Sequence, residues 1–502
     1  MSKKVTIYCN IGLFKELFEF QLDIAQKHLD QGDSVNFLVC SGFIPICETT
    51  REKSLSICAR CISRRNHGIS LLKGKVKKYS IHLFSKKNDK SIPIKDTFKN
   101  LEELKSLKID AFPIGNSVLS SVADLEREHI PCTKKYKNEI SDFVNTSKNL
   151  YDCMYNFITL KEPDIVYVYN GRHATTRPIV EACKKTKTSF FSYEWCYRGN
   201  GYEMCEDTIV QDMKYRKKVM NELWNKKDIT QNEKEKIGGD FYNKKYSARS
   251  VYGKKLSING DLPDNWSQDN YNITIFTSSE YEDFTVPEFT LNNFYKSQID
   301  GLKRILSTDK IKCDKSIFFY IRLHPVLGDI KDVPQEIEPF LSLEQDFPNC
   351  EVVMPRSSIS SYVLLKHSDK IIHFRSTIGA EAVMIGKPTI MLWKHFMNNS
   401  GSFYTPKSHQ ETVSMILDQN MQPKSKLGAL KYGYFYMNFY SKYKYLEFCR
   451  RKNAFFFRGK VVVTTAFVED FLLYNFHRPK LKWLRKIINK MLLSFSRRLV
   501  SP

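Results

Sequence analysis

The feature that most constrains this chain is the order of strand and helix signals at its start. Residues 4–9 (KVTIYC) are β-rich, and residues 34–42 (SVNFLVCSG) form a second run of the same kind. Between them, apolar residues recur at every third or fourth position up to Gly32, which is the period of an amphipathic helix. Strand, helix and strand in so short a span predict a βαβ unit, and therefore a parallel sheet with a right-handed crossover.

The same order returns further along the chain. Residues 164–195 contain a strand, a helix and a strand, and residues 271–392 contain a longer alternation. We expect an α/β protein with two Rossmann-like domains, because 502 residues exceed the roughly 250–300 that one core supports. The predicted parts are an N-terminal, acceptor-side domain at 1–210, a helical linker region at 211–268, a C-terminal donor domain at 269–440, and C-terminal helices at 441–502 that return toward the first domain.

Polar residues follow four of the predicted strands, at the point where each strand ends. Open parallel sheets bind ligands outside the carboxyl ends of their strands. We therefore expect the two domains to face each other across a cleft that these residues line. The four segments are Asn170-Gly171-Arg172, Thr277-Ser278-Ser279-Glu280, Arg322-Leu323-His324-Pro325 and Arg375-Ser376-Thr377.

Three of these segments belong to motifs: YNGRHATTRPIVEA (169–182), RLHP (322–325) and FRSTIGAEAVMIGKPTIML (374–392). In them the chain resembles bacterial capsule and surface-polysaccharide biosynthesis proteins of the GT-B glycosyltransferase type. Polysialyltransferase-like, capsule Kdo-transferase-like and teichoic-acid-polymerase-like enzymes have similar C-terminal motifs. The resemblance implies two Rossmann-like domains, a nucleotide-sugar donor and a transfer that needs no metal or other cofactor, with inversion as the expected outcome.

Residues 373–388 form the most specific segment and predict the donor site. Ser376 and Thr377 follow a strand, and Gly379 opens a helix whose N–H groups and positive end suit a phosphate. Glu381 is expected to accept hydrogen bonds from ribose hydroxyls. The alternative is an ordinary strand-turn-helix in which a Ser or Thr caps the helix and a Glu lies in its first turn.

The His-Pro segment is expected on the other side of the donor phosphate. By resemblance, His324 binds that phosphate, and Arg322 and Arg375 add positive charge where the departing nucleotide becomes negative. Because no DxD-type metal motif lies near the site, helix ends and cationic side chains would take the place of a divalent metal. A purely structural histidine at a strand end is the alternative.

An inverting transfer also needs a base that deprotonates the acceptor hydroxyl. Glu194, which follows SFFSY in the predicted strand 189–195, is favoured because it lies in the N-terminal half; Glu282 is a second candidate, with Glu280 and Asp283 beside it. A surface carboxylate on a loop is an equal alternative for each. Asn170, Gly171 and Arg172, together with Ser278 and Ser279, are expected to hold substrate or to shape the cleft.

The C-terminal segment 478–499 predicts a membrane-surface helix. After Pro479, apolar residues fall on one helical face, and Lys and Arg supply charge without an acidic residue. Packing of this helix on the protein body is the alternative. No run is long enough to span a bilayer, no signal peptide is evident, and scattered cysteines indicate reduced thiols, so we expect a cytoplasmic protein, peripheral on the inner membrane face.

Cys47, Cys58, Cys61 and His67 form a second cluster. Three thiolates and one imidazole at this spacing suit a structural zinc ion. Free cysteines in a loop, or thiolates stabilised by the neighbouring arginines, are the alternatives, because a lone CxxC is weak evidence.

These signals favour a glycosyltransferase that moves a sugar from a nucleotide-activated donor to a capsule, lipopolysaccharide or related glycan, and the expected acceptor is a glycan or a lipid-linked glycan. A nucleotide-sugar epimerase or a polyol-phosphate transferase of the same fold is one alternative, and a non-catalytic component of a polysaccharide assembly complex is another. The net charge of +23 also suits nucleic acid, but the chain lacks any nucleic-acid-binding signature, so no nucleic-acid partner is expected.

Overall fold

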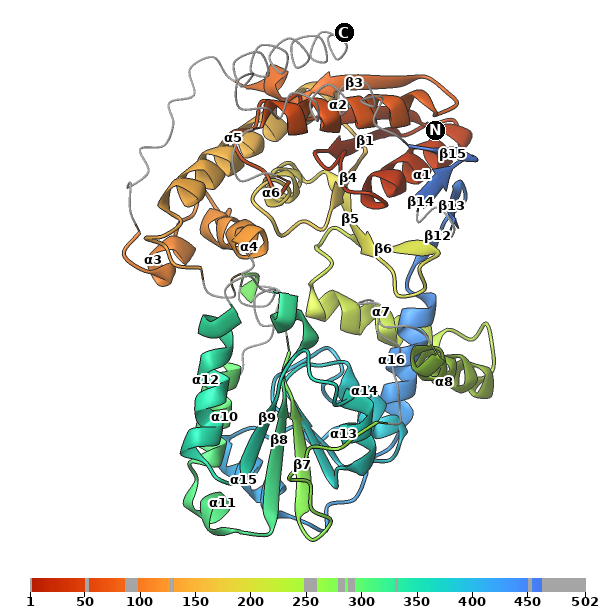
Figure 1. Cartoon of the computed structure of the whole chain (residues 1–502). Coiled ribbons are helices and arrows are strands. Elements are labelled where there is room, and N and C mark those ends of the chain that lie inside the picture. The colour runs from red at the N-terminus through yellow and green to blue at the C-terminus, as the bar shows by residue number, and fades with distance from the viewer. Residues whose placement is uncertain are drawn as a thin grey trace, which may run out of the picture. The chain divides into compact units, whose positions relative to one another are not determined.

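The computed structural model describes residues 2–49, 54–85, 98–126, 128, 131–247, 260–278, 285–287, 294–329, 333–449 and 454–462 (Figure 1). These residues form two compact units. Unit 1 contains the described residues up to Val210, except residue 128, together with those from Tyr440 on, and unit 2 contains Gln211–Phe439. Each unit has its own sheet, and the predicted α/β class with parallel sheets is confirmed.

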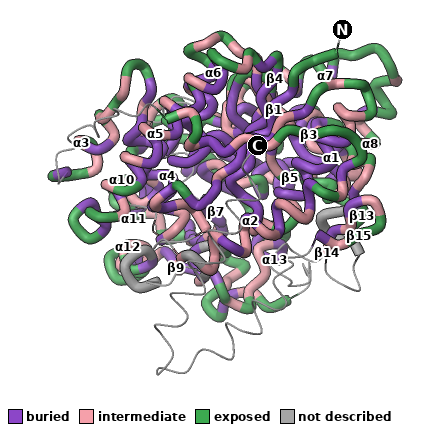
Figure 2. Tube along the Cα trace, turned by 90° about the horizontal axis from the view of Figure 1, so that it is seen from above, coloured by how far each residue is buried: buried purple, intermediate pink, exposed green. Residues whose placement is uncertain are grey.

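Unit 1 is built on a seven-stranded sheet in the order β12-β6-β5-β4-β1-β2-β3. The five strands from β5 to β3 are parallel, whereas β6 runs antiparallel to β5 and β12 runs antiparallel to β6. Its central strands are buried, as Figure 2 shows for β1, in which only Lys4 is exposed. The strands are β1 (Lys4–Cys9), β2 (Ser34–Val39), β3 (Val76–Ser80), β4 (Ile165–Tyr169), β5 (Ser189–Trp195), β6 (Gly201–Glu206) and β12 (Ser441–Lys442).

Helix α1 (Leu17–Asp30) shows how the periodic stretch after β1 folds. It starts at Leu17 because Glu16 and Glu19 form a capping box, in which the Glu19 carboxylate accepts the Glu16 N–H at 2.7 Å. It ends before Gly32, whose φ of +82° is a left-handed conformation that glycine adopts without strain. The buried face of α1 packs on β1 and β2, so the predicted βαβ unit is confirmed.

The remaining helices of unit 1 lie between its strands in the sequence. α6 packs on β4 and β5, and α5 packs on α6 and α4. The unit therefore has the doubly wound arrangement that parallel strands with helical crossovers produce. The helices are α2 (Leu55–Ser70), η1 (Ile81–Phe84), α3 (Leu101–Lys105), α4 (Ile114–Glu126), α5 (Lys137–Lys161) and α6 (Arg177–Thr186).

Unit 2 contains a five-stranded, fully parallel sheet in the order β11-β10-β7-β8-β9. Its strands are nearly all buried, as expected where helices cover both faces of a parallel sheet. The strands are β7 (Tyr271–Phe276), β8 (Ile317–Arg322), β9 (Cys350–Val353), β10 (Lys370–His373) and β11 (Thr389–Met391). The helices between them in the sequence are α10 (Gln298–Leu306), α11 (Asp309–Cys313), η3 (Pro325–Asp329), α12 (Val333–Asp346), α13 (Ser361–His367) and α14 (Ile378–Met384), and α15 (His409–Leu417) follows β11.

The predicted helical region at 211–268 is part of unit 2 and not a separate linker. Its helices α7 (Met213–Asn225) and α8 (Gln231–Ser247) pack against α16 (Leu427–Asn438). Glycines allow the close approach of α8 and α16, because a Cβ at Gly238 would lie 2.3 Å from the Leu430 carbonyl oxygen and one at Gly433 would lie 2.2 Å from the Gly238 oxygen.

The prediction of helices after residue 440 is wrong for the part that the structure describes. The described residues of this part, 441–449 and 454–462, contain β12 and a three-stranded antiparallel sheet in unit 1. Arg458 and Gly459, with φ of +51° and +77°, form a tight hairpin turn, which favours strands over a helix here. The strands are β13 (Leu446–Cys449), β14 (Ala454–Phe457) and β15 (Lys460–Val461).

Two predictions fall outside the described residues: the membrane-surface helix at 478–499, and the carboxylates at 280–283 with Ser279. Within the described residues, no helix is both long and apolar enough to cross a membrane. The predicted cleft concerns the arrangement of the two units and stays a prediction.

Candidate functional site

The sheet of unit 2 has a topological switch point between β7 and β10. From β7 the chain continues through β8 to β9 on one side, and it then returns to β10 and β11 on the other side. The crevice at the carboxyl ends of two strands that diverge in this way is where open α/β sheets bind ligands. The residues after β7, β8 and β10 are therefore the first candidates for a ligand site in unit 2.

Thr277 and Ser278 join the ends of these three strands. The Thr277 N–H donates to the Arg322 carbonyl oxygen at 3.1 Å, and the Thr277 hydroxyl accepts the His324 N–H at 2.8 Å. On the other side, the Ser278 hydroxyl accepts the Arg375 N–H at 2.9 Å. Three of the four predicted polar segments thus lie together at one edge of this sheet.

Gln298, the first residue of α10, fixes the position of Ser278. Its side-chain amide accepts the Ser278 N–H at 2.6 Å and donates to the Ser278 carbonyl oxygen at 2.8 Å. Both residues are buried. This paired contact replaces the strand partner that β7 lacks beyond Phe276, so Gln298 orients the turn that carries the serine.

The guanidinium of Arg322 is held by the protein backbone. It donates to the carbonyl oxygens of Val353 at 3.4 Å, of Met354 and of Pro355 at 3.4 Å, and to the Ser361 hydroxyl at 3.2 Å. Burial lowers its pKa to about 10. These contacts are those of an arginine that shapes the β9–α13 loop, and a role at a donor phosphate stays a prediction.

Ser376 and Thr377 form the turn between β10 and α14. Thr377 lies at the N-cap position but makes no capping hydrogen bond with its side chain, and Glu381 lies in the first turn of α14. Backbone bonds close the turn, with the Gly379 N–H donating to the Ser376 oxygen at 3.2 Å. Glu381, expected to contact a ribose, is buried at 2% exposure.

Gly379 rests on the imidazole of His373, the last residue of β10. A Cβ at this position would lie 2.1 Å from the Nε2 atom of His373, so only glycine fits without movement. The ring is fully buried, and burial lowers the pKa of His373 to about 3 and that of His395 well below its usual value. Both imidazoles are therefore neutral. His373 lies directly beneath Gly379, and the Arg375 guanidinium stacks 5.7 Å from the Trp393 ring centroid.

Unit 1 has its own switch point, between β1 and β4. Asn10 follows β1, and its side-chain amide donates to the Thr175 hydroxyl at 2.7 Å. The Thr175 hydroxyl in turn donates to the Glu48 carboxylate at 2.5 Å, which also accepts the Ser121 hydroxyl at 2.7 Å. A carboxylate from a distant loop thus fixes the turn after β4.

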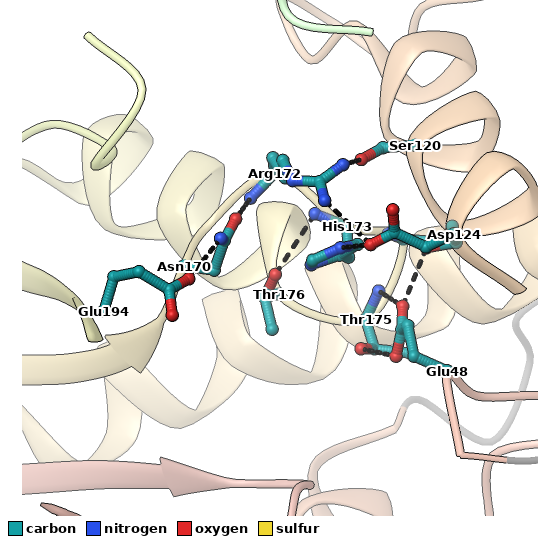
Figure 3. A network of polar contacts seen from close by, with 11 residues as sticks. Glu48, Ser120, Asp124, Asn170, Arg172, His173, Thr175, Thr176 and Glu194 are labelled. Carbon is teal, nitrogen blue, oxygen red and sulfur yellow. Dashed lines mark hydrogen bonds and ion pairs between the residues drawn. The ribbon is translucent and has the colours of Figure 1, made fainter. Parts of the chain in front are cut away.

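Asp124 of α4 holds the same turn from a second side (Figure 3). Its carboxylate accepts from Arg172 Nη2 at 2.7 Å and lies 2.6 Å from His173 Nε2. The Arg172 guanidinium and the His173 ring hold the pKa of Asp124 well below its usual range, against the effect of burial. Arg172 also donates to the Ser120 hydroxyl at 2.6 Å, so its side chain points into unit 1.

Glu194 and Asn170 meet at the carboxyl ends of β5 and β4 (Figure 3). The Asn170 amide donates to Glu194 at 2.7 Å, and the Trp195 N–H donates to its other oxygen at 3.1 Å. Burial and Glu194 together raise the pKa of Tyr169, which hydrogen-bonds the same carboxylate. Asn170 and Gly171 have φ of +55° and +89°, a strained turn of the type that concentrates at functional sites.

The four predicted zinc ligands do not converge. Cys47, Cys58 and Cys61 line a small cavity of about 30 Å³, whereas His67 lies in the last turn of α2. Burial raises the pKa of Cys47 and Cys61, which favours neutral thiols. Among the described residues, no group of three or more His, Cys, Asp or Glu side chains is placed to hold a metal ion. Zinc in this cluster stays a prediction, and metal analysis of the purified protein tests it.

Sequence reasoning found the strand ends but missed the residues that position them. Glu48, Asp124 and Gln298 come from loops and helices remote from the motifs they serve. Glu48 is 127 residues from Thr175, and no local pattern links the two. The described candidates divide between two sheet edges. One sheet edge of unit 1 carries Glu194, Asn170, Gly171 and Arg172. At or near one sheet edge of unit 2 lie Ser278, Arg322, His324, Arg375, Ser376, Thr377, Gly379 and Glu381.

Comparison with known proteins gives a match that spans β6 of unit 1 and most of unit 2. Residues 201–425 match the model of the family described as capsule polysaccharide biosynthesis protein. No curated protein matches the sequence. The segment includes the His-Pro and Gly-Lys-Pro motifs, but not the Asn-Gly-Arg motif at 169–182.

Among solved structures, the chain is similar to the beta Kdo 2,4 transferase KpsC of Thermosulfurimonas dismutans, with 15% identity over 57% of this chain and 80% of that one and a TM-score of 0.35. It is also similar to the UDP-GlcNAc 2-epimerase of Neisseria meningitidis bound to UDP-GlcNAc, with 12% identity over 86% of this chain and 96% of that one and a TM-score of 0.30. A third similar structure is the glycosyltransferase SnogD of Streptomyces nogalater, with 11% identity over 87% of this chain and 95% of that one and a TM-score of 0.26. Such scores carry no assignment of activity. The resemblance predicted from the sequence is thus confirmed through the family match: over residues 201–425, this chain is similar to the capsule polysaccharide biosynthesis proteins.

Proposed function

We propose that this chain is a glycosyltransferase that moves a sugar from a nucleotide-activated donor to a capsule or related surface glycan. The observation that carries the proposal is the capsule-family match over residues 201–425, which include the whole sheet of unit 2 and its switch point. The hydrogen bonds of Thr277 and Ser278 support it, because they bring His324 and the turn at Ser376 to adjacent strand ends.

In this proposal the donor lies at the carboxyl edge of the unit 2 sheet. The diphosphate or monophosphate of the nucleotide lies at the turn formed by Ser376 and Thr377, where the start of α14 and the cationic Arg375 favour negative charge. His324, on the neighbouring side of β7, stabilises the phosphate as it leaves. The buried, neutral imidazole of His373 lies below Gly379, so it adds no charge and supports the turn.

The acceptor lies at the carboxyl edge of the unit 1 sheet, and Glu194 is the base. Asn170, Tyr169 and the Trp195 N–H hold its carboxylate in one orientation. Glu194 takes the proton of an acceptor hydroxyl, and the hydroxyl oxygen forms the new bond to the anomeric carbon. The bond from that carbon to the phosphate oxygen breaks, and the nucleotide leaves with the electron pair.

Thermal unfolding with CMP, CDP, UDP and GDP tests the donor site. A nucleotide at about 100 times its Kd stabilises a protein by about 2.7 kcal/mol, which raises the Tm by several degrees. We expect one nucleotide to do so, and we expect His324→Ala and Ser376→Ala to remove its effect. His367→Ala and Ser414→Ala are matched controls, since both side chains are exposed on helices of unit 2 outside the switch point.

Retention of the full Tm shift by both site variants would show that the donor site is misplaced, and the absence of a shift with every nucleotide would reject the proposal. An activity assay then separates glycosyl transfer from its same-fold alternatives. A transferase consumes the sugar nucleotide only when an acceptor glycan is present, whereas an epimerase converts it alone. A non-catalytic assembly component consumes none.

We propose further that residues 478–499 attach the protein to an anionic membrane surface on the cytoplasmic side. The support is the sequence alone: an apolar helical face beside lysines and arginines, with Trp483 at its start. Flotation with phosphatidylglycerol vesicles compares the full chain with one that ends at residue 477. Equal binding of the two proteins would reject the attachment.

A further inference from the structure

An exposed pair of aromatic side chains stands at the end of β5, next to the proposed acceptor site. Trp195 is 41% exposed and Tyr197 is 38% exposed. Cys196 between them is buried, so the two aromatic residues are left on the outside of the turn. Trp195 is the one tryptophan that is exposed among the described residues; Trp224 and Trp393 are buried, and Trp266 is partly buried.

The turn that carries the pair is held firmly. The Gly199 N–H donates to the Cys196 oxygen at 3.2 Å. The φ of +66° at Gly199 closes the turn. A surface that is fixed before binding loses little entropy when a ligand arrives, so this pair is suited to recognition.

The indole of Trp195 also rests on a buried aromatic cluster. Its ring makes an edge-to-face contact with Phe20, at 5.5 Å between centroids. Phe20 is itself fully buried and packs against Tyr202 and Tyr443, each at 5.5 Å. The cluster fixes the plane of the indole, while two fifths of Trp195 stays open to solvent.

The aromatic pair is continuous with the polar edge described above. Trp195 follows Glu194 directly and donates its N–H to the Glu194 carboxylate at 3.1 Å. Successive residues of a strand point to opposite faces of the sheet, so the carboxylate and the indole lie on either side of the same carboxyl edge. A ligand that meets both must cross this edge, which an extended polymer of several linked units can do.

We infer that Trp195 and Tyr197 form a second acceptor subsite, which binds a pyranose ring of the glycan chain one or more units away from the hydroxyl at Glu194. An aromatic face packs against the apolar C–H face of a pyranose, while the sugar hydroxyls stay hydrated or bond to polar neighbours. This inference rests on the proposed function, because it assigns the adjacent carboxylate to the acceptor. An anionic lipid surface is the competing occupant, and the test below separates it from a glycan.

The test starts with the full chain on an array of bacterial polysaccharides and oligosaccharides. For a glycan that binds, the Kd is then measured with fragments of one to six sugars. We expect affinity to rise when a second or third sugar is added, and Trp195→Ala to lose this rise and to bind the longer fragments about tenfold more weakly. Trp195→Phe should recover most of the affinity, whereas Trp195→Leu, which is apolar but has no ring face, should not.

Tyr155→Ala is the matched control, since this aromatic residue of α5 is 39% exposed and lies away from the edge. Equal binding by wild type and Trp195→Ala, full recovery by Trp195→Leu, or no glycan bound by wild type would overturn the inference. So would vesicle binding that depends on Trp195 in place of glycan binding. The Tm shift caused by nucleotides is measured on the same proteins. If no nucleotide raises the Tm of wild type, the proposed function is rejected. If a nucleotide does so and Trp195→Ala binds the glycan as wild type does, only the subsite is rejected.

Discussion

Replacing Gly379 with alanine measures how tightly the turn of the proposed donor site is built on the core of unit 2. A Cβ at this position would lie 2.1, 2.4 and 2.5 Å from three atoms of the His373 imidazole. The ring is fully buried and packs against Phe403 at 5.6 Å between centroids. Because the ring has no path to solvent, either it or the first turn of α14 must move by more than about 1 Å to restore contact distances of roughly 3.5 Å.

Two effects of opposite sign decide the outcome. Alanine stabilises a helix interior by about 1 kcal/mol relative to glycine. Overpacking of a filled core costs about 1–3 kcal/mol, and more where neither partner can shift. With both partners fixed, we expect the upper part of that range and a net loss of about 1–2 kcal/mol. For a domain of this size, such a loss lowers the Tm by about 2–8 °C.

The assay is thermal unfolding of wild type and variant, with and without the nucleotide that stabilises wild type. Gly239→Ala is the control, since Gly239 lies within α8 and the nearest atom to a Cβ there is 3.9 Å away. That variant keeps the helix-propensity gain without the clash, so its Tm should rise. We also expect Gly379→Ala to weaken nucleotide stabilisation, because the displaced turn carries Ser376 and Thr377. A Tm of Gly379→Ala at or above that of wild type would refute the reasoning.

Three further substitutions test other contacts. Asp124→Asn should lower the free energy of unfolding at pH 7 by about 2 kcal/mol, because Arg172 and His173 lose an ionised partner that is only partly exposed. Since the folded-state pKa of Asp124 is depressed, the contribution of this carboxylate to stability is present above about pH 4 and fades below it. The urea unfolding midpoints of wild type and Asp124→Asn should therefore converge at low pH. Lys370 donates to three backbone carbonyls at the end of α15, and burial lowers its pKa to about 8. The unfolded chain therefore keeps this proton to a higher pH than the folded protein does, and the free energy of unfolding of wild type relative to Lys370→Met should grow by about 2 kcal/mol between pH 7 and 9.5. The same change in stability with pH for both proteins would contradict this prediction. Arg322→Lys should cost about 1–2 kcal/mol in urea unfolding, because a lysine cannot reach the same set of carbonyls, and an unchanged midpoint would speak against a structural role.

Most of the sheet could be predicted from the sequence, because buried parallel strands are continuous apolar runs. The runs at 4–9 and 189–195 became β1 and β5 with the same bounds. Beyond Phe276 the run at 271–284 continues as polar residues, and β7 ends there. The direction of the edge strands was harder to predict. β6 runs antiparallel to β5, and β12 runs antiparallel to β6, but nothing in their local sequence specifies these neighbours.

The candidate site, like the sheets, could be predicted only where its features are local in the sequence. Strand ends are local features, so Asn170, Ser278, His324 and Ser376 could be chosen from hydrophobic patterning and resemblance. Their roles depend on partners that only the fold supplies. Arg322, for example, points to backbone carbonyls more than thirty residues away, which no pattern within the RLHP segment indicates.

The return of the chain at Tyr440 has a consequence for biosynthesis. β6 and β12 are neighbours in one sheet, yet residues 211–439 of unit 2 lie between them in the sequence. A ribosome adds roughly 5–20 residues per second, so the outer edge of β6 stays uncovered for roughly 10–50 s after its own synthesis. During that interval the edge is open to pairing with other nascent chains, and unit 2 is complete before unit 1 can close. Cells that make this protein would therefore be expected to protect the nascent chain with a ribosome-associated chaperone, and a chain that ends before residue 440 should aggregate through the β6 edge.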